Sequence, residues 1–260
     1  QLDDAATHAT SAGCTILLTD AAGATIYNHG SGSTIEFYSS SFISLQKNTV
    51  LMQGGAVAPD VFVVYNCLFD GIYWGSVTGL DAYNVYITKA TFGMQDVKAP
   101  STTDRLTVSD CGYGMMVWGP NSLYVTNAVV QRAVTTSFLF NTNVADSYLV
   151  DGECDVWNIT WAGVCTAEFF RQYTFNMQVV DADGAGILGV TVAMVDNAAG
   201  AVFSVATDAN GDIAEQIVTY GYYDPANGNV IQPGGVGYTP FTVTLSKAGY
   251  ITRTIVYAVD

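Results

Sequence analysis

A six-residue pattern of apolar and polar positions recurs through the first 155 residues of the chain. An apolar residue opens the pattern, a polar residue is third, a small residue is fourth, and an apolar residue usually closes it. The copies begin at Phe37, Val64, Ile87, Val108 and Val125, with a weaker one at Val150. A β-branched and aromatic repeat of roughly two dozen residues predicts stacked β-coils, each of which needs its neighbours to bury its apolar side.

The third position of the pattern predicts a sharp corner in each coil, because Asn and Asp tolerate left-handed backbone angles. The residues in this position are Ser39, Asn66, Lys89, Asp110 and Asn127. Further apolar strands follow at 72–74, 115–118, 137–140 and 157–159. Over residues 33–168 the pattern resembles the right-handed parallel β-helix of the pectate-lyase-like superfamily. A β-sandwich or a propeller with accidental self-similarity is the alternative.

The two ends of the chain differ from this repeat. Residues 1–32 are predicted to form an N-terminal arm and cap, because 1–13 are small and polar while 14–18 and 24–27 read as short strands. Residues 169–260 contain six alternating segments with turn residues between them, which predicts an all-β, Ig-like sandwich. These segments are 173–180, 190–195, 202–207, 213–220, 241–245 and 251–258.

Four short segments make this C-terminal region resemble the carboxypeptidase regulatory-like domain, a transthyretin-type β-sandwich. They are Val-Val-Asp-Ala-Asp-Gly at 179–184, Val-Thr-Val at 190–192, Thr-Asp-Ala-Asn-Gly at 207–211 and Ser-Lys-Ala-Gly-Tyr at 246–250. The resemblance implies a non-catalytic spacer or interaction module.

Composition excludes several classes of function. The chain of 260 residues is 50% apolar and 12% charged, and its net charge is −15 with only eight Lys and Arg. Such a surface repels nucleic acid and anionic membranes, and no apolar run approaches the ~20 residues that span a bilayer. The start at Gln1 predicts a secreted protein whose signal peptide has been removed. The sequon Asn158-Ile159-Thr160 predicts a glycan on Asn158.

The five cysteines are an odd number, so at least one is expected to stay unpaired or to bond another chain. Cys67 and Cys111 occupy the same place in the pattern, two coils or roughly 9.6 Å apart, which is too far for a disulfide. A disulfide between Cys154 and Cys165 is the preferred pairing. Cys14 is the candidate for an intermolecular bond or a free thiol.

Candidate catalytic residues come only from the repeat itself. Four places before each start of the pattern lie Ser33, Asp60, Tyr83, Asp104, Asn121 and Asp146. If these residues form one column along the coil stack, Asp104 and Asp146 would flank a sugar at roughly the separation of the acid and base of an inverting glycosidase. Alternatively, Ser, Asp and Asn cap turns there. His8 and His29 lack metal-like spacing, and no hydrolase, nucleotide or zinc motif occurs.

The remaining candidates are a calcium loop and sugar-binding aromatics. Asp208, Asn210 and Asp212 suggest a calcium loop, but the Gly spacing fits a plain hairpin turn better. Aromatic side chains suit sugar rings, although at β spacing they more often fill a core or an interface. The sequence therefore favours a non-catalytic, extracellular structural subunit that polymerises with copies of itself, without a cofactor. An adhesin or carbohydrate-binding protein is the second interpretation, and a polysaccharide lyase or glycoside hydrolase is the third.

Overall fold

The computed structural model of the chain is all-β and divides into two compact units. One unit contains residues 1–169 and 224–229, and the other contains 170–223 and 230–260. The structure describes residues 8–18, 25–28, 34–45, 49–54, 61–74, 77–78, 80–95, 97–98, 102–119 and 122–259, and no helix occurs among them.

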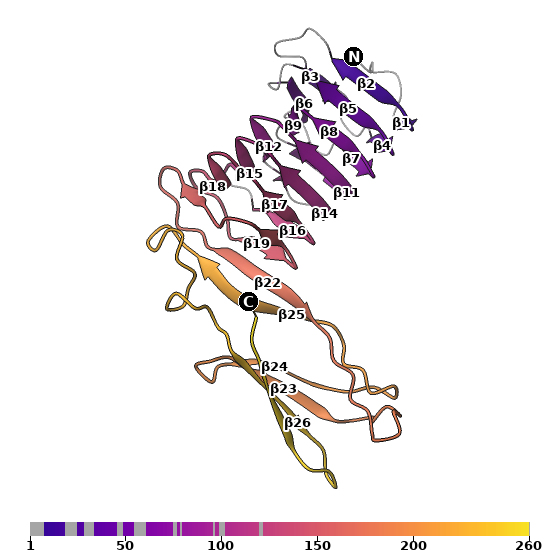
Figure 1. Ribbon diagram of the computed structural model, residues 1–260, viewed down its shortest axis with the longest axis vertical. Coiled ribbons are helices and arrows are strands. Elements are labelled where there is room, and N and C mark those ends of the chain that lie inside the picture. Colours follow the sequence, from indigo (N-terminus) through magenta and orange to yellow (C-terminus); the bar gives the residue numbers. More distant parts are fainter. Residues whose placement is uncertain are drawn as a thin grey trace. The chain divides into compact units, whose positions relative to one another are not determined.

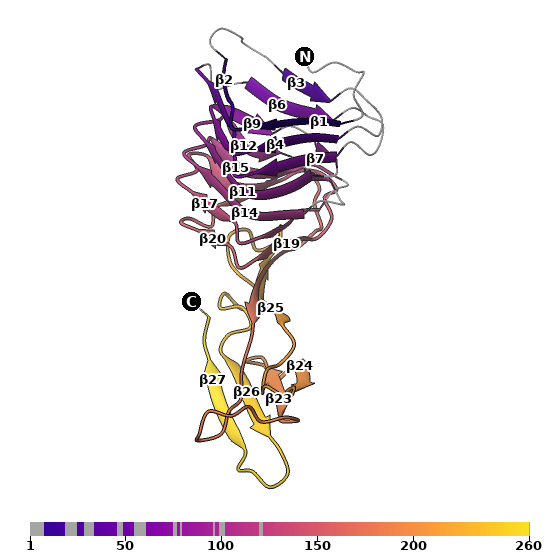
Figure 2. The same ribbon diagram turned by 90° about the vertical axis from the view of Figure 1, so that its right-hand side faces the viewer.

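The first unit is a parallel β-helix, as predicted, in which each coil adds strands to three parallel rows (Figures 1 and 2). The first row contains β1 (His8–Ala12), β4 (Thr34–Tyr38), β7 (Val61–Tyr65), β11 (Leu80–Thr88), β14 (Thr102–Ser109), β16 (Tyr124–Thr126) and β19 (Ser147–Val150). The second row contains β2 (Thr15–Leu18), β5 (Ser41–Ser44), β8 (Leu68–Asp70), the ends of β11 and β14, β17 (Val129–Gln131) and β20 (Glu153–Cys154).

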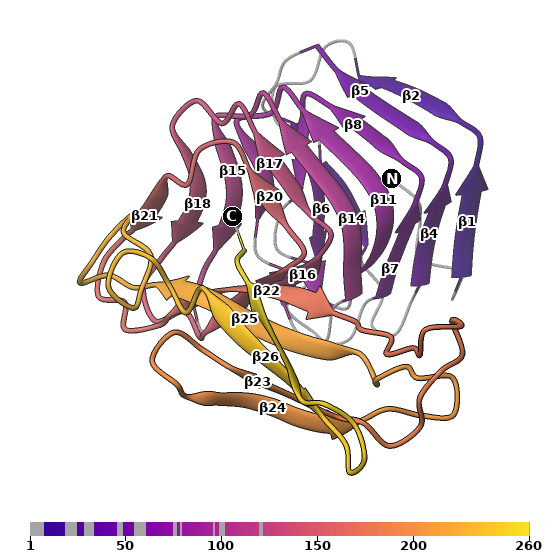
Figure 3. The same ribbon diagram turned by 60° about the horizontal axis from the view of Figure 1, so that its bottom comes forward.

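The third row forms a separate sheet, on the other side of the coils (Figure 3). It contains β3 (Thr25–Asn28), β6 (Thr49–Gly54), β9 (Ile72–Trp74), β12 (Phe92–Gln95), β15 (Tyr113–Val117), β18 (Thr136–Phe140) and β21 (Ile159–Trp161). A short pair, β10 (Val77–Thr78) with β13 (Val97–Lys98), lies outside these rows.

Two corners with left-handed backbone separate the three rows. The first corner joins rows one and two at Gly13, Ser39, Asn66, Asn84, Arg105, Asn127 and Asp151. The second joins rows two and three at Gly71, Lys89, Asp110 and Arg132. All of these residues have positive φ, so the prediction of left-handed corner residues is confirmed. The pattern read from the sequence mixes the two corners, however, because both place a polar residue before a small one.

Ladders of inward side chains form the core of the β-helix. In the second row Phe42, Phe69, Ile87, Val108 and Val130 follow one another in register, and all are buried. In the third row Met94, Met115 and Phe138 do the same. Because each ladder contacts only the coils above and below, one coil cannot bury its apolar side alone.

The third row approaches the second so closely that two inward positions are glycine. Gly93 and Gly114 precede the paired residues Met94 and Met115, and the equivalent residue in the next coil is Ser137. A methyl group on Gly114 would overlap the carbonyl oxygen of Ser137 and lie 2.7 Å from Cγ1 of Val130. The absence of a side chain therefore sets the spacing between the two rows.

Two predictions about the coils are wrong. Residues 8–12 are not part of an arm, because they form β1 and pair with β4 along its whole length. Main-chain pairing needs no bulky side chains, so small and polar residues can also form a strand beside β4. Cys67 and Cys111 do not share a column, because Cys67 follows the first corner and Cys111 the second. Both are nevertheless free, buried thiols, as expected.

The second unit contains a four-stranded antiparallel sheet in the order β24-β23-β26-β27. These strands are β23 (Thr191–Val195), β24 (Ala201–Ala206), β26 (Phe241–Ser246) and β27 (Arg253–Tyr257). Strands β22 (Phe169–Phe175) and β25 (Gln216–Tyr223) are neighbours in sheet order and lie outside this four-stranded sheet. One core cluster draws on both groups of strands and contains Phe175, Val192, Met194, Ile213, Val218, Phe241 and Val243.

Candidate functional site

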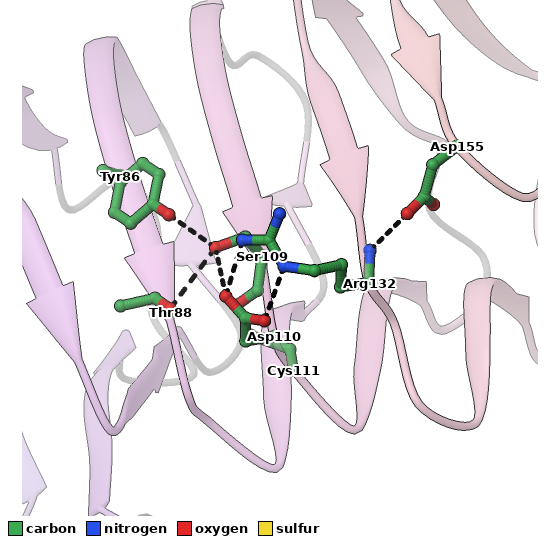
Figure 4. A network of polar contacts seen from close by, with 7 residues as sticks. All are labelled: Tyr86, Thr88, Ser109, Asp110, Cys111, Arg132 and Asp155. Carbon is green, nitrogen blue, oxygen red and sulfur yellow. Dashed lines mark hydrogen bonds and ion pairs between the residues drawn. The ribbon is translucent and has the colours of Figure 1, made fainter.

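A series of alternating charges lies at or directly beside the second corner of the β-helix, and Figure 4 shows the part of it from Asp110 to Asp155. This charge ladder consists of Asp70, Lys89, Asp110, Arg132 and Asp155. Lys89 Nζ lies 2.9 Å from Asp70 Oδ2. Arg132 holds Asp110 with two parallel bonds, 2.7 Å from Nε to Oδ1 and 2.8 Å from Nη2 to Oδ2. The Arg132 backbone amide donates to Asp155 Oδ2 at 2.7 Å.

A chain of hydroxyl groups supports the charge ladder from the sheet beside it (Figure 4). The hydroxyls of Tyr86 and Ser109 are 2.6 Å apart. Ser109 Oγ, which is buried, also lies 3.1 Å from Asp110 Oδ2 and 3.3 Å from Thr88 Oγ1. These contacts fix the Asp110 carboxylate in the orientation that accepts the fork of Arg132.

The electrostatics of this site oppose a role in proton transfer. Hydrogen bonding to Arg132 lowers the pKa of Asp110 to about 2, so this carboxylate stays ionised at neutral pH. The same contact raises the pKa of Arg132. A general acid needs a pKa near the working pH, and neither group of this pair approaches that condition. A shallow hollow of about 540 Å³ beside Lys89 and Asp110 is therefore lined by fixed charges.

Replacing Arg132 with glutamine is expected to raise the pKa of Asp110 from about 2 towards the ordinary value. A carboxylate whose folded-state pKa is depressed adds stability above its unfolded pKa of about 4, and that stability is lost as the pH falls towards 2. Wild type should therefore lose this contribution between about pH 4 and 2, and the variant should lack it at neutral pH.

Carbon-13 NMR titration of the Asp110 carboxyl measures this shift directly. Lys89→Gln is the matched control, because the positive charge of Lys89 lowers the pKa of Asp110 much less than Arg132 does, so its removal should move the titration much less. An Asp110 carboxyl that titrates at the same pH in wild type and in Arg132→Gln would contradict the assignment.

A second column on the surface is aromatic, and two of its three members, Tyr38 and Tyr65, were not predicted from the sequence. This tyrosine ladder consists of Tyr38, Tyr65 and Tyr83, which are paired in register immediately before the first corner. All three side chains are partly exposed. Their common sequence signal is a tyrosine directly before the left-handed residue, as in Tyr38-Ser39, Tyr65-Asn66 and Tyr83-Asn84.

The predicted catalytic column is wrong. Asp104 is paired with Tyr83 and Thr126, and Thr126 is paired with Val150, so Asp146 lies four residues away from this column. The pattern at Ile87 and Val108 belongs to the second corner, whereas the copies at 37, 64, 125 and 150 belong to the first. The position four residues before each copy therefore differs between the two corners, and the six candidate residues do not form one column. Ser33, Asp60 and Asn121 lie outside the described residues.

Asp104 and Asp146 instead make separate structural contacts. Asp104 Oδ1 accepts hydrogen bonds from Thr126 Oγ1 at 3.0 Å and Asn127 Nδ2 at 2.7 Å, both in the following coil. Asp146 Oδ1 accepts from the backbone amide of Glu168 at 2.9 Å. Both contacts favour the alternative interpretation of the sequence, in which these carboxylates order turns and corners.

The proposed calcium-loop residues form a turn. Asp208 Oδ1 accepts from the backbone amides of Asn210 at 2.8 Å and Asp212 at 3.0 Å. Asp181 and Asp196 make the same pair of bonds to amides two and four residues later. Over the part of the chain that the structure describes, no three His, Cys, Asp or Glu side chains gather as a metal site. These carboxylates satisfy turn amides.

The structure leaves the predicted cysteine and glycan chemistry open. Among the described residues no disulfide is present, so the predicted Cys154–Cys165 bond and the predicted role of Cys14 stay predictions. Cys154 Sγ contacts the carbonyl oxygen of Val156 at 2.9 Å. The Asn158 amide nitrogen, which would carry a glycan, donates to the Thr135 carbonyl at 2.9 Å.

Comparisons with known proteins supply no family for the chain. Across the described ranges, no helix is long and apolar enough to cross a membrane. No protein-family model matches the sequence, and no curated protein matches it either.

Proposed function

We propose that this chain is a secreted structural subunit that self-associates through the edge strand β27. The observation that carries the proposal is the exposure of this strand, since all five residues of Arg253–Tyr257 are exposed. Ile255 is 44% exposed and Val256 is 68% exposed. An exposed apolar edge strand offers unpaired backbone groups to another chain, and natural monomers usually protect such edges.

The pairing of β27 inside its own sheet leaves one side of the strand for a partner. Its other side is paired in antiparallel register with β26, from Phe241 opposite Tyr257 to Leu245 opposite Arg253. In the sheet order β27 is terminal, so among the described strands none covers its outer edge. Addition of a strand there would supply main-chain hydrogen bonds without requiring a pocket.

The charges of β27 favour a second copy in antiparallel orientation. Pairing centred on Ile255 places Arg253 of one copy opposite Tyr257 of the other, an arrangement that suits a cation and an aromatic ring. Parallel pairing would place the two arginines side by side, and like charges directly opposite each other destabilise a sheet. We therefore assign an antiparallel dimer contact to this edge.

The other features fit an extracellular support rather than an enzyme. The second unit, which we propose is a transthyretin-type sandwich, presents β27 at the edge of its antiparallel sheet. The β-helix has few charges to form a reactive site, and Arg132 keeps Asp110 ionised. The low content of Lys and Arg and the sequon at Asn158 support secretion.

Replacing Val256 with lysine is expected to weaken self-association by about tenfold or more, because a lysine on an edge strand must be desolvated when another strand pairs there. The fold should be little affected, because Val256 is already 68% exposed. Sedimentation velocity over a concentration series measures the association, and electron microscopy of concentrated samples shows whether polymers form.

Val134→Lys is the matched control, since it adds the same charge at a valine of the β-helix that is 81% exposed. It should associate as wild type does. A wild-type chain that stays a monodisperse monomer at all concentrations would falsify the proposal, and so would equal association of wild type and Val256→Lys.

A further inference from the structure

The tyrosine ladder presents aromatic rings without a parallel stack. The rings of Tyr38 and Tyr65 are 5.6 Å apart at an interplanar angle of 85°, and those of Tyr65 and Tyr83 are 6.0 Å apart at 69°. Edge-to-face contacts of this kind do not bury the rings against one another, as a parallel stack would. The Arg105 guanidinium lies 5.0 Å from the centre of the Tyr83 ring. Tyr38 and Tyr65 are thus the rings best placed to receive a ligand.

Fixed hydrogen-bonding groups lie beside these rings. The Tyr65 hydroxyl donates to Asp81 Oδ2 at 2.9 Å, which orients both side chains. At the neighbouring corner, Asn84 Nδ2 donates to Asn66 Oδ1 at 2.9 Å, and both amides are exposed. Carboxylate and amide oxygens accept hydrogen bonds, and an amide nitrogen donates two. A ligand that covers the rings would therefore meet both acceptors and donors along its sides.

The charges around the ladder select the class of ligand. Glu36 and Asp81 lie on the same strands as Tyr38 and Tyr83, each two residues before the tyrosine. The pKa of Tyr38 is raised, first by burial and then by the negative charges of Glu36 and Asp81. These carboxylates, in a chain of net charge −15, repel uronic acids, sulfated sugars and phosphates.

We propose that the tyrosine ladder, together with Asp81, Asn66 and Asn84, binds an uncharged polysaccharide. Tyr38 and Tyr65 contact the apolar faces of its sugar rings, while Asp81 and the amides bond its hydroxyl groups. The ladder repeats once per coil, at roughly 4.8 Å, so an extended chain that follows the coil stack engages several positions at once. This geometry favours a polymer over a single sugar.

Affinity electrophoresis in gels that contain hydroxyethyl cellulose, mixed-linkage β-glucan or polygalacturonate tests the proposal. The two neutral polymers are offered as probes of uncharged glycans, and polygalacturonate represents acidic ones. Wild type should be retarded by at least one neutral polymer and not by polygalacturonate. Tyr65→Ala should bind that polymer about tenfold more weakly, because an aromatic contact is lost.

Tyr124→Ala is the matched control, because Tyr124 is 46% exposed in the same row of strands but lies outside the tyrosine ladder. It should bind as wild type does. Asp81→Asn keeps the tyrosine rings, removes one carboxylate and should also bind the neutral polymer more weakly. If thermal melting shows that Tyr65→Ala is unfolded, Asp81→Asn replaces it as the test variant.

Three outcomes would overturn the proposal. The first is an absence of retardation by either neutral polymer, and the second is equal binding by wild type and the variants of Tyr65 and Asp81. The third is a loss of self-association in Tyr65→Ala without glycan binding by wild type, which would make the ladder a contact between copies. Self-association through β27 is measured separately with Val256→Lys, so either proposal can fail alone.

Discussion

Replacing Phe138 with alanine is expected to lower the free energy of unfolding of the β-helix by about 3–5 kcal/mol. Phe138 is fully buried in β18. Its ring is stacked on Trp157 at 5.8 Å and tilted against Phe169 at 4.7 Å. Removing the ring leaves a cavity between coils that the closed main-chain ladders on both sides prevent from collapsing.

Guanidinium denaturation followed by tryptophan fluorescence isolates this effect, because all four tryptophans belong to the first unit. Phe92→Ala is the matched control, since Phe92 lies in the same row but is only half-buried and stacks on Tyr113 at 4.9 Å. Phe92→Ala should lower the free energy of unfolding by about 1 kcal/mol. Equal losses for the two variants would mean that inward and outward positions of this row have been misassigned.

Replacing Gly114 with alanine is expected to destabilise the same unit by about 1–3 kcal/mol through overpacking. The added methyl group would overlap the carbonyl oxygen of Ser137, and this backbone atom belongs to the parallel ladder between β15 and β18. Relief of the overlap would require the two strands to separate. Gly114→Val should be worse, because its larger side chain also meets Val130.

Ser137→Ala is the control for this glycine, because it places a methyl group at the equivalent position one coil later. The backbone already accommodates a side chain there, so the variant should lose only the bond from Ser137 Oγ to the Val156 carbonyl, which is 2.6 Å long. We expect this variant to lose about 1 kcal/mol of the free energy of unfolding, measured in the same denaturation experiment. A Gly114→Ala protein as stable as wild type would show that the rows are not held at this spacing.

The fold was readable from the sequence because its two determinants are local. Alternating apolar residues predict the strands, and Asn66, Asp110 and Asn127 predict left-handed corners from their own side-chain chemistry. The register was not readable, because Arg105 and Arg132 adopt the same positive φ without any local preference that marks them. Only packing against the neighbouring coils holds an arginine in that conformation.

The functional surfaces were harder to predict for the same reason. Tyr38 and Tyr65 occupy the second place of the pattern, but Tyr83 belongs to a corner marked by Asn84, which the pattern centred on Lys89 obscured. The charge ladder joins residues that are roughly twenty positions apart, and their contacts exist only once the coils are in register. Both surfaces therefore depend on the register between coils, which the sequence of a single coil does not determine.

Because the charges of the charge ladder alternate in sign, the number of coils that can be added to this part of the β-helix without bringing like charges together is even. At the second corner, or one residue before it in the case of Asp70, an acidic side chain is followed by a basic one in the next coil, from Asp70 through Lys89 and Asp110 to Arg132. Duplication of one coil here would bring two lysines or two aspartates into adjacent coils. Duplication of two coils preserves the alternation, so growth of this part of the molecule in even steps avoids the repulsion.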